Sequence, residues 1–340
     1  MKRDAMLLVD ALRNPASAVA LDAEGWTALL AMARAEQLIG TLARRLSGLP
    51  APEAVHRILD EARVNAEYQR CSALWEADCA RRSLADYAGK VVLMKGTAYA
   101  AAGLKASEGR HIGDLDIMVA HEDLPQVEEA LLGAGWEWVK DDDYDDTYYR
   151  DHMHELPPLI HKIRDRMIDV HHTILPLTAR PKPDAAVMLA DAVKLGNGLH
   201  VFAPVDMVIH SAAHLFADGE LDGGLRNLWD IHCLLAEYGD DSFWPALKSR
   251  AGRHQIWPAV HRAAGLAHRL YGTEIPQEYK FGQNQWFIRR LTARDDWGRG
   301  TRKFTRLAFY IRSHWLRMPP VMLARHLWVK WRKGSGLASQ

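Results

Sequence analysis

Apolar residues recur at spacings of three and four along the first 88 residues, which is the period of an amphipathic helix. The longest such run consists of Trp26, Leu29, Leu30, Ala33, Leu38, Leu42 and Leu46. Asp22 is suited to an N-cap in front of this run, and the Gly-Leu-Pro sequence at 48–50 is a stop signal after it. A second long helix, rich in Ala, Glu and Arg, is expected over 51–86. Residues 1–88 are therefore predicted to form a helical scaffold.

Between residues 89 and 180 the pattern changes to short apolar runs separated by turns. The first three runs that predict strands cover 90–96, 109–120 and 136–140. Two more strands are expected on either side of a polar turn near 162–166, and an amphipathic helix at 121–135 ends in glycines. Residues 89–180 are therefore predicted to form a mixed α/β unit.

Helical periodicity returns after this unit and is clearest over 205–219 and 225–239. The expected fold class is α+β, with a mixed sheet and its own helices in the central unit. An N-terminal helical region at 1–88 and a C-terminal helical region at 181–335 would flank it.

Composition excludes several classes of protein. The chain has 340 residues, of which 48% are apolar and 25% charged, whereas a disordered chain is poorer in apolar residues or carries a large net charge. No apolar run approaches the roughly 20 residues of a membrane-spanning helix. The basic start is followed by a short apolar stretch interrupted by Asp10, which makes a poor signal peptide. Three cysteines are too few for a disulfide framework, so the expected compartment is the cytoplasm.

The net charge of zero hides an uneven distribution. Residues 280–340 contain 14 Lys and Arg against 2 Asp and Glu, so this tail carries +12 and the rest of the chain −12. The tail also contains many aromatic residues. It either packs its helices on the acidic body, binds an anionic partner such as nucleic acid or a membrane surface, or recognises a peptide. Aromatic residues at helical spacing are more often core than binding surface, so the first interpretation is favoured.

The sequence GDLDIMV contains the most informative chemistry. Residues two apart in a strand project from the same face, so Asp114 and Asp116 would present neighbouring carboxylates. Asp169 lies in another predicted strand and adds a third carboxylate if the two strands are neighbours. Oxygen ligands favour a hard cation such as Mg²⁺. Three carboxylates can hold two metal ions about 4 Å apart, as in phosphoryl and nucleotidyl transfer.

A second feature lies upstream, where a predicted strand runs into a short helix. Gly96 and Thr97 stand at this junction, and the free backbone N–H groups of a helix N-terminus suit a triphosphate. Lys95 adds positive charge beside them.

The strings LMKGTAYAAAGL, RHIGDLDIMV and IDVHH resemble the bacterial family of uncharacterised nucleotidyltransferases, within the DNA-polymerase-β-like superfamily. A downstream segment that begins PVDMVIHSAAHLF is also similar, and the resemblance covers roughly residues 25–330. It implies that 89–180 is the catalytic domain. It also implies that Asp114 and Asp116 are metal ligands and that Asp169 is the third carboxylate, which helps to activate the attacking hydroxyl.

The same resemblance places Gly96 and Thr97 where the superfamily's Gly-Ser turn binds phosphates. Here Lys-Gly-Thr replaces the usual residues, and 17 residues separate Gly96 from Asp114, which is longer than in many members. Arg110, four residues before the first aspartate, either neutralises phosphate charge or pairs with a carboxylate.

Four polar residues of the C-terminal region have helical spacing: His210 and His214 are four apart, as are Arg226 and Asp230. A polar network that includes an Arg226–Asp230 ion pair is the favoured interpretation, with substrate contact and a zinc site at the two histidines as alternatives. His171 would share a strand face with Asp169, where it can orient the carboxylate or contact substrate.

The expected function is metal-dependent transfer of a nucleotidyl group from an NTP, with Mg²⁺ or Mn²⁺, to an acceptor. The acceptor class is open among a peptide, a small molecule and RNA. One alternative is a kinase-like tailoring enzyme that transfers a phosphoryl group to a peptide or small metabolite. Another is a non-catalytic nucleotide-binding or antitoxin-like module that retains the fold.

Overall fold

The structure is a computed structural model that describes residues 3–139, 149–150, 152–217, 221–280, 282, 284–317 and 328. Its N-terminal part is helical, as predicted. The elements are α1 (Met6–Arg13), η1 (Pro15–Ala20), α2 (Ala23–Ala35), α3 (Ile39–Arg45) and α4 (Glu53–Ser83). Asp22 caps α2 as expected, because its side chain accepts a hydrogen bond from the backbone N–H of Gly25 at 2.7 Å.

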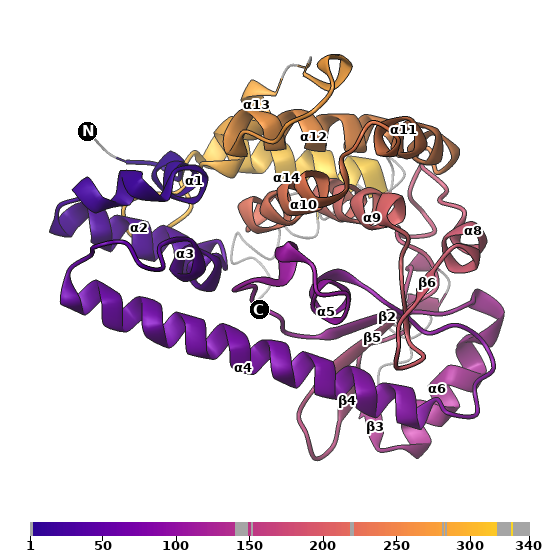
Figure 1. The fold of residues 1–340 in the computed structure, drawn as a ribbon. Coiled ribbons are helices and arrows are strands. Elements are labelled where there is room, and N and C mark those ends of the chain that lie inside the picture. The colour runs from indigo at the N-terminus through magenta and orange to yellow at the C-terminus, as the bar shows by residue number, and fades with distance from the viewer. Residues whose placement is uncertain are drawn as a thin grey trace, which may run out of the picture.

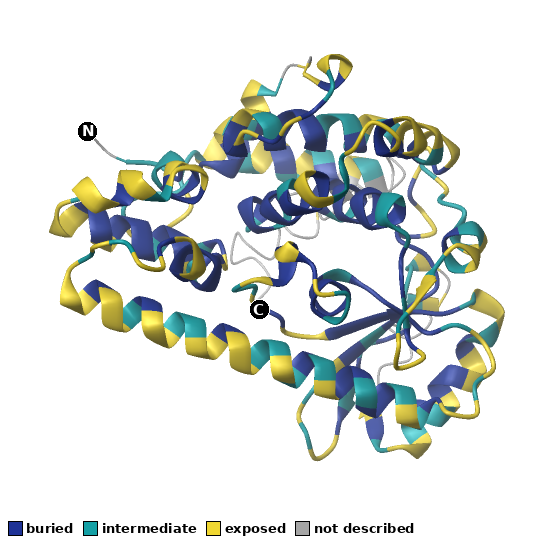
Figure 2. Cartoon of the chain, in the orientation of Figure 1, coloured by how far each residue is buried: buried dark blue, intermediate teal, exposed yellow. Residues whose placement is uncertain are grey.

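Helix α4 forms the long lower edge of the molecule in Figure 1. Its buried positions follow the spacing of three, four and seven that defines one helix face. The apolar residues among them are Val55, Leu59, Ala66, Ala73, Ala77, Cys79 and Ala80. Figure 2 shows that the opposite face of α4 is exposed along most of its length. The helix contacts α3 at one end and the central unit at the other, so it ties the two regions together.

The central unit contains the predicted strands and helices in the predicted order. They are β1 (Val92–Leu93), α5 (Lys95–Ala101), η2 (Lys105–Ser107), β2 (Leu115–Met118), η3 (His121–Asp123), α6 (Leu124–Gly133), β3 (Trp136–Trp138), β4 (Leu159–His161) and β5 (Met167–His171). Strands β4 and β5 pair in antiparallel fashion around the polar turn, and β2 lies parallel to β5. The α+β fold class is therefore confirmed.

The C-terminal part differs from the prediction in one respect. After α8 (Ala185–Ala190) the chain forms a short hairpin of β6 (Val193–Lys194) and β7 (His200–Val201). Strand β7 pairs in parallel with β1, so the described sheet has seven strands in the order β3-β4-β5-β2-β1-β7-β6. This hairpin was not predicted, because strands of two residues are too short to produce a period of two.

Helices follow the hairpin as predicted. They are α9 (Pro204–Ala217), α10 (Gly224–Tyr238), α11 (Phe243–Arg253), α12 (Trp257–Tyr271), η4 (Gln277–Tyr279), α13 (Gln285–Leu291) and α14 (Lys303–Arg317). Helices α9 and α10 are largely buried and lie between α12 and the central unit (Figures 1 and 2). A single cluster of buried apolar residues runs from Ala5 to Phe309, so the three regions share one core. None of the described helices is both long and apolar enough to cross a membrane.

Part of the positive charge of the tail is paired with the acidic body. Arg294 contacts Glu36 and Asp222, each at 2.7 Å, and Arg302 contacts Asp4 at 2.8 Å. The described part of the tail therefore packs on the body through α13 and α14. Most of the sequence after residue 317 lies outside the described residues, and contact of the tail with an anionic partner stays a prediction.

A close contact of two backbones fixes the loop in front of β2. Gly109 has a positive φ of 66°, and a Cβ on it would clash with the carbonyl oxygen of Gly40 in α3. A Cβ on Gly40 would in turn lie 2.5 Å from the carbonyl oxygen of Gly109. Both positions therefore require glycine for steric reasons, and the contact locates Arg110 relative to the N-terminal helices.

Candidate active site

Strands β2 and β5 bring the three predicted carboxylates together. Asp116 in β2 is the register partner of Asp169 in β5, and Asp114 lies immediately before β2. One carboxylate oxygen of each residue lies within 4.8 Å of the others. Because the parallel strands β2 and β5 place Asp116 and Asp169 directly beside each other, backbone pairing holds these two carboxylates together.

Asp116 is the buried member of the cluster, with 3% of its surface exposed. Its Oδ1 accepts a hydrogen bond from Nζ of Lys95 at 2.6 Å and lies 3.0 Å from Nε2 of His171. Burial alone would raise the pKa of Asp116, but Lys95 and His171 outweigh that effect and hold the pKa well below its usual range. Asp116 is therefore ionised, and its orientation is fixed from two sides.

The pKa of Asp169 is shifted in the opposite direction. Burial, reinforced by the negative charges of Asp116, Glu155 and Asp114, raises the pKa of Asp169 to about 8. The cluster thus holds more negative charge than its own cations neutralise. Its donor atoms are all carboxylate oxygens, which suits Mg²⁺ or Mn²⁺, and a bound divalent cation would reverse the shift of Asp169.

A second group of potential ligands lies next to the first and was missed by sequence reasoning. His154, Glu155 and His171 have ligand atoms within 4.8 Å of one another, and Nδ1 of His171 lies 3.3 Å from Glu155. Glu155 reaches this place because its backbone forms an isolated antiparallel bridge with His171. One residue pair in a loop leaves no periodic signal, so the contact was not predictable from the sequence.

The residues predicted to bind phosphate occupy the start of α5. Lys95 has a φ of 48°, which is unusual for a residue other than glycine, and its ammonium group points to Asp116. A Cβ on Gly96 would clash with the guanidinium of Arg110, so glycine is required there by packing. Oγ1 of Thr97 is buried without a hydrogen-bond partner among the described residues. Phosphate contact by Gly96 and Thr97 stays a prediction.

Arg110 belongs to a network that links the central unit to the helices. Its Nε donates to Asp230 at 3.0 Å, and Asp230 also accepts from Arg226 at 2.5 Å. Arg226 in turn donates to Oγ1 of Thr41 in α3 at 2.7 Å. The expected Arg226–Asp230 ion pair is present. Two roles were predicted for Arg110, neutralising phosphate charge or pairing with a carboxylate. The structure shows the second, with Asp230 as the partner.

His210 and His214 project from α9 toward the carboxylates. Together with Lys95, Asp169 and His171 they line a cavity of about 240 Å³. Burial lowers the pKa of His210 well below its ordinary value, so its ring is neutral. Neither histidine belongs to a group of three potential metal ligands within the described parts of the chain, and a zinc site at this pair has no support there. Their position fits the substrate-facing alternative.

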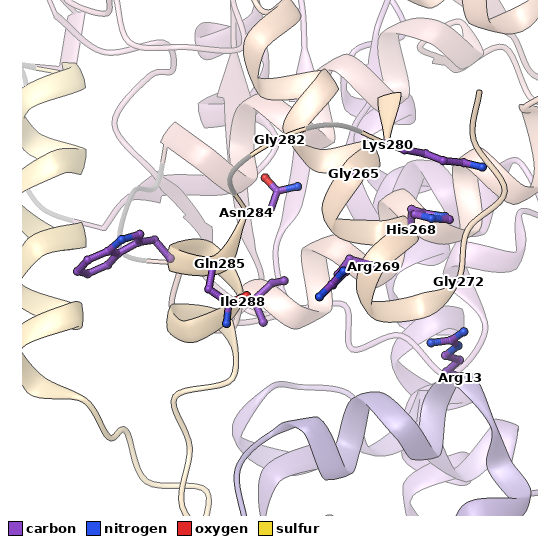
Figure 3. A pocket seen from close by; sticks show the side chains of 11 residues that line it. Arg13, Gly265, His268, Arg269, Gly272, Lys280, Gly282, Asn284, Gln285 and Ile288 are labelled. Atoms are coloured by element: carbon purple, nitrogen blue, oxygen red, sulfur yellow. The ribbon is translucent and has the colours of Figure 1, made fainter. Parts of the chain in front are cut away.

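A larger cavity lies elsewhere in the described part of the chain and has a different character. It measures about 800 Å³ and is lined by parts of α1, α12 and α13. Figure 3 shows four basic side chains around it, Arg13, His268, Arg269 and Lys280. Among the described residues it shares no lining residue with the carboxylate cavity and has no carboxylate on its wall, so it lacks the oxygen ligands that Mg²⁺ prefers.

A mixed sheet that presents aspartates on two neighbouring parallel strands, packed among helices, defines an α+β protein of the nucleotidyltransferase type. A family model described as uncharacterised nucleotidyltransferase matches residues 22–272, and the chain belongs to this family. No curated protein and no solved structure matches the chain. The predicted family is therefore confirmed.

Proposed function

We propose that the protein is a Mg²⁺- or Mn²⁺-dependent nucleotidyltransferase that uses an NTP. The observation that carries this proposal is the cluster of Asp114, Asp116 and Asp169 beside a cavity, in a chain of a nucleotidyltransferase family. A cavity of about 240 Å³ has room for only part of a nucleotide and its acceptor, so we expect the rest to extend toward solvent from this point.

The three aspartates would hold the metal ions. Bound Mg²⁺ supplies positive charge that neutralises the phosphate oxygens and aligns the triphosphate. Lys95 and His171 keep Asp116 ionised and oriented, because both contact the same oxygen of that carboxylate. Fixed charges that need no rearrangement during the reaction provide most of the stabilisation in this class of chemistry.

Asp169 is the candidate base. In the proposed reaction it takes the proton of the acceptor hydroxyl, the hydroxyl oxygen bonds to the α-phosphorus of the NTP, and the bond to pyrophosphate breaks. Its carboxylate lies within 4.8 Å of those of Asp114 and Asp116, and a bound divalent cation would lower its pKa again, so that Asp169 would be ionised and able to accept the proton. His210 and His214 would face the substrate from the opposite wall of the cavity.

The proposed function is tested by determining which phosphate group of a labelled NTP is transferred to the acceptor. The protein is incubated with Mg²⁺ or Mn²⁺, host extract and an NTP labelled at either the α- or the γ-phosphate, and the labelled product is identified by mass spectrometry. Nucleotidyl transfer places the α-label on the acceptor and releases pyrophosphate. Transfer of the γ-label with release of a nucleoside diphosphate would instead establish the kinase-like alternative.

Variants separate chemistry from binding in the same assay. Asp114→Asn and Asp169→Asn should each abolish labelling, whereas Asp86→Asn, an exposed aspartate before β1, should leave it unchanged. Full labelling by both site variants would overturn the assignment. Nucleotide binding without turnover of any acceptor would support a non-catalytic module.

A further inference from the structure

A second, mostly apolar cavity adjoins the carboxylate site. It measures about 180 Å³ and is lined by residues of α9, α12, α14 and the loop after β5. Leu175 lines both this cavity and the one that contains Asp169. Helix α9 also contributes to both, through His210 and His214 on one side and Ala213 and Phe216 on the other. The two cavities are therefore neighbours across one residue of the loop and one turn of a helix.

Two arginines interrupt the apolar wall. Arg262 of α12 and Arg312 of α14 both line the cavity, and their guanidinium carbons lie 4.6 Å and 5.3 Å from the ring centroid of Phe287. Within the described ranges no carboxylate lies at ion-pair distance from either arginine, and Nη1 of Arg312 is buried without a hydrogen-bond partner. Burial lowers the pKa of both guanidinium groups, and the charge of Arg262 lowers that of Arg312 further.

Two neighbouring, partly buried positive charges without a counter-ion among the described residues are unfavourable in isolation. Contact with the face of Phe287 offsets part of the cost, but it satisfies few of the N–H donors. The ligand chemistry that resolves both problems is an oxyanion, because carboxylates and phosphates accept paired hydrogen bonds from guanidinium groups. Apart from Gln255 the remaining wall is apolar, which favours an apolar group as the carrier of the oxyanion.

We propose that this cavity binds the acceptor substrate through an oxyanion, a carboxylate or phosphate, that is carried by an apolar group. This inference rests on the proposed function, since it takes the neighbouring carboxylate site as the place of transfer. An apolar cavity of about 150 Å³ accommodates a benzene ring, so 180 Å³ suits one aromatic or branched aliphatic group. Binding there would direct the rest of the acceptor past Leu175 toward Asp169.

The test uses three small probes of similar shape: 3-phenylpropanoate, phenyl phosphate and the neutral 3-phenylpropanamide. Their binding to the full chain is measured by calorimetry and by ligand-observed NMR. At least one oxyanion should bind about tenfold more tightly than the amide, and the two oxyanions compared with each other identify the preferred group. Equal binding of all three probes, or no binding of any, would overturn the proposal.

Variants locate the binding site. Arg262→Met and Arg312→Met should each weaken oxyanion binding about tenfold while leaving amide binding unchanged. Arg269→Met is the matched control, because Arg269 lies two turns along α12 from Arg262, is exposed and lines the large basic cavity instead. Loss of oxyanion binding in the control but not in the other two would place the probe in the basic cavity and contradict the proposal.

Two further measurements keep the outcome clear. Both methionine variants should unfold at a temperature equal to or above that of the unaltered protein, because each removes an uncompensated charge. A marked loss of stability would show that the arginines are already compensated in the folded protein, by a counter-ion or by their contact with Phe287, and would contradict the proposal. Binding of Mg²⁺ and NTP is measured on the same samples and should be unchanged. Probe binding without NTP binding would refute the proposed function alone, and the reverse result would refute this inference alone.

Discussion

Nζ of Lys95 lies 2.6 Å from Oδ1 of Asp116, although the two residues are 21 positions apart in the chain. Lys95 is the first residue of α5 and has a positive φ. In this backbone conformation its side chain points into the carboxylate cluster. A residue predicted to face phosphate therefore acts as a counter-charge for Asp116, a ligand of the proposed metal site.

Lys95→Met should lower the free energy of unfolding in EDTA by about 2 kcal/mol, because buried Asp116 loses its closest cation. Saturating Mg²⁺ should then stabilise the variant more than the unaltered protein, since the metal replaces the missing charge. Urea unfolding in EDTA and in MgCl₂ measures both effects. Lys105→Met, at an exposed position after α5, serves as the control. An identical gain from Mg²⁺ in all three proteins would show that Lys95 is no counter-charge at the metal site.

Asp114→Asn should remove most of the stabilisation that Mg²⁺ gives. A ligand at 100 times its Kd stabilises a folded protein by about 2.7 kcal/mol, and this gain should be clear in the unaltered protein and small in the variant. Asp114 is exposed, so its replacement should change stability in EDTA by no more than about 0.5 kcal/mol. Thermal unfolding across a MgCl₂ titration gives both values. Retention of the full gain would remove Asp114 from the ligand set.

Asp230→Asn should destabilise the protein by about 3 kcal/mol or more. Arg226 and Arg110 are both buried against this carboxylate and would lose its charge together. The control is Glu108→Gln, which breaks the exposed ion pair with Arg44 and should cost less than about 1 kcal/mol. Urea unfolding of the two variants compares them directly, and similar losses would contradict a special role for the buried network.

Gly109→Ala should be far more harmful than Gly103→Ala. Both glycines have positive φ angles, 66° and 69°, so each substitution carries the backbone cost of about 1 kcal/mol. Only Gly109 has a backbone in the space that a Cβ would fill, whereas the space at Gly103 is open. We expect an additional loss of about 2 kcal/mol at Gly109, measured by chemical unfolding. Equal losses would mean that the contact with Gly40 relaxes easily.

Stability should fall as the pH drops from about 6.5 to about 4, and His232 should account for part of the fall. Burial, with a smaller contribution from Arg45, lowers the pKa of His232 from 6.5 to about 4. The unfolded chain therefore binds this proton first as the pH falls, which favours unfolding by up to about 3 kcal/mol.

His232→Gln should flatten this dependence by about the same amount, while the amide can still bond to Oγ1 of Thr273. Urea unfolding at pH 7 and pH 4.5 measures the difference. His56→Gln, at an exposed position of α4, should leave the dependence as it is. An unaltered slope in His232→Gln would refute the assignment.

Much of the fold was predictable because its signals are local. The Asp22 cap, the buried stripe of α4 and the order of strands from β1 to β5 all follow from residue types and periodicity. Strands β6 and β7 were not predicted, since β6 pairs only with β7 and the pairing of β7 with β1 is a long-range contact of two residues. Propensity is weak evidence for so short an element.

In the candidate site, too, some residues could be predicted from local sequence patterns and others could not. Asp114, Asp116 and Asp169 could be named from two strand patterns, and their meeting depended only on β2 and β5 being neighbours. Glu155 could not be named, because its approach to His171 depends on the path of a loop. The pairing of Arg110 with Asp230 joins residues 120 positions apart, and no spacing rule reports such a contact.

The parallel pairing of β2 and β5 has a consequence for how this protein can change. Backbone hydrogen bonds of the pair set the positions of Asp116 and Asp169, whatever the length of the chain that connects the two strands. That connection includes α6, β3 and β4, and insertions or deletions in its turns need not move the carboxylates. Related chains can therefore differ in this segment while Asp116 and Asp169 keep their positions relative to each other.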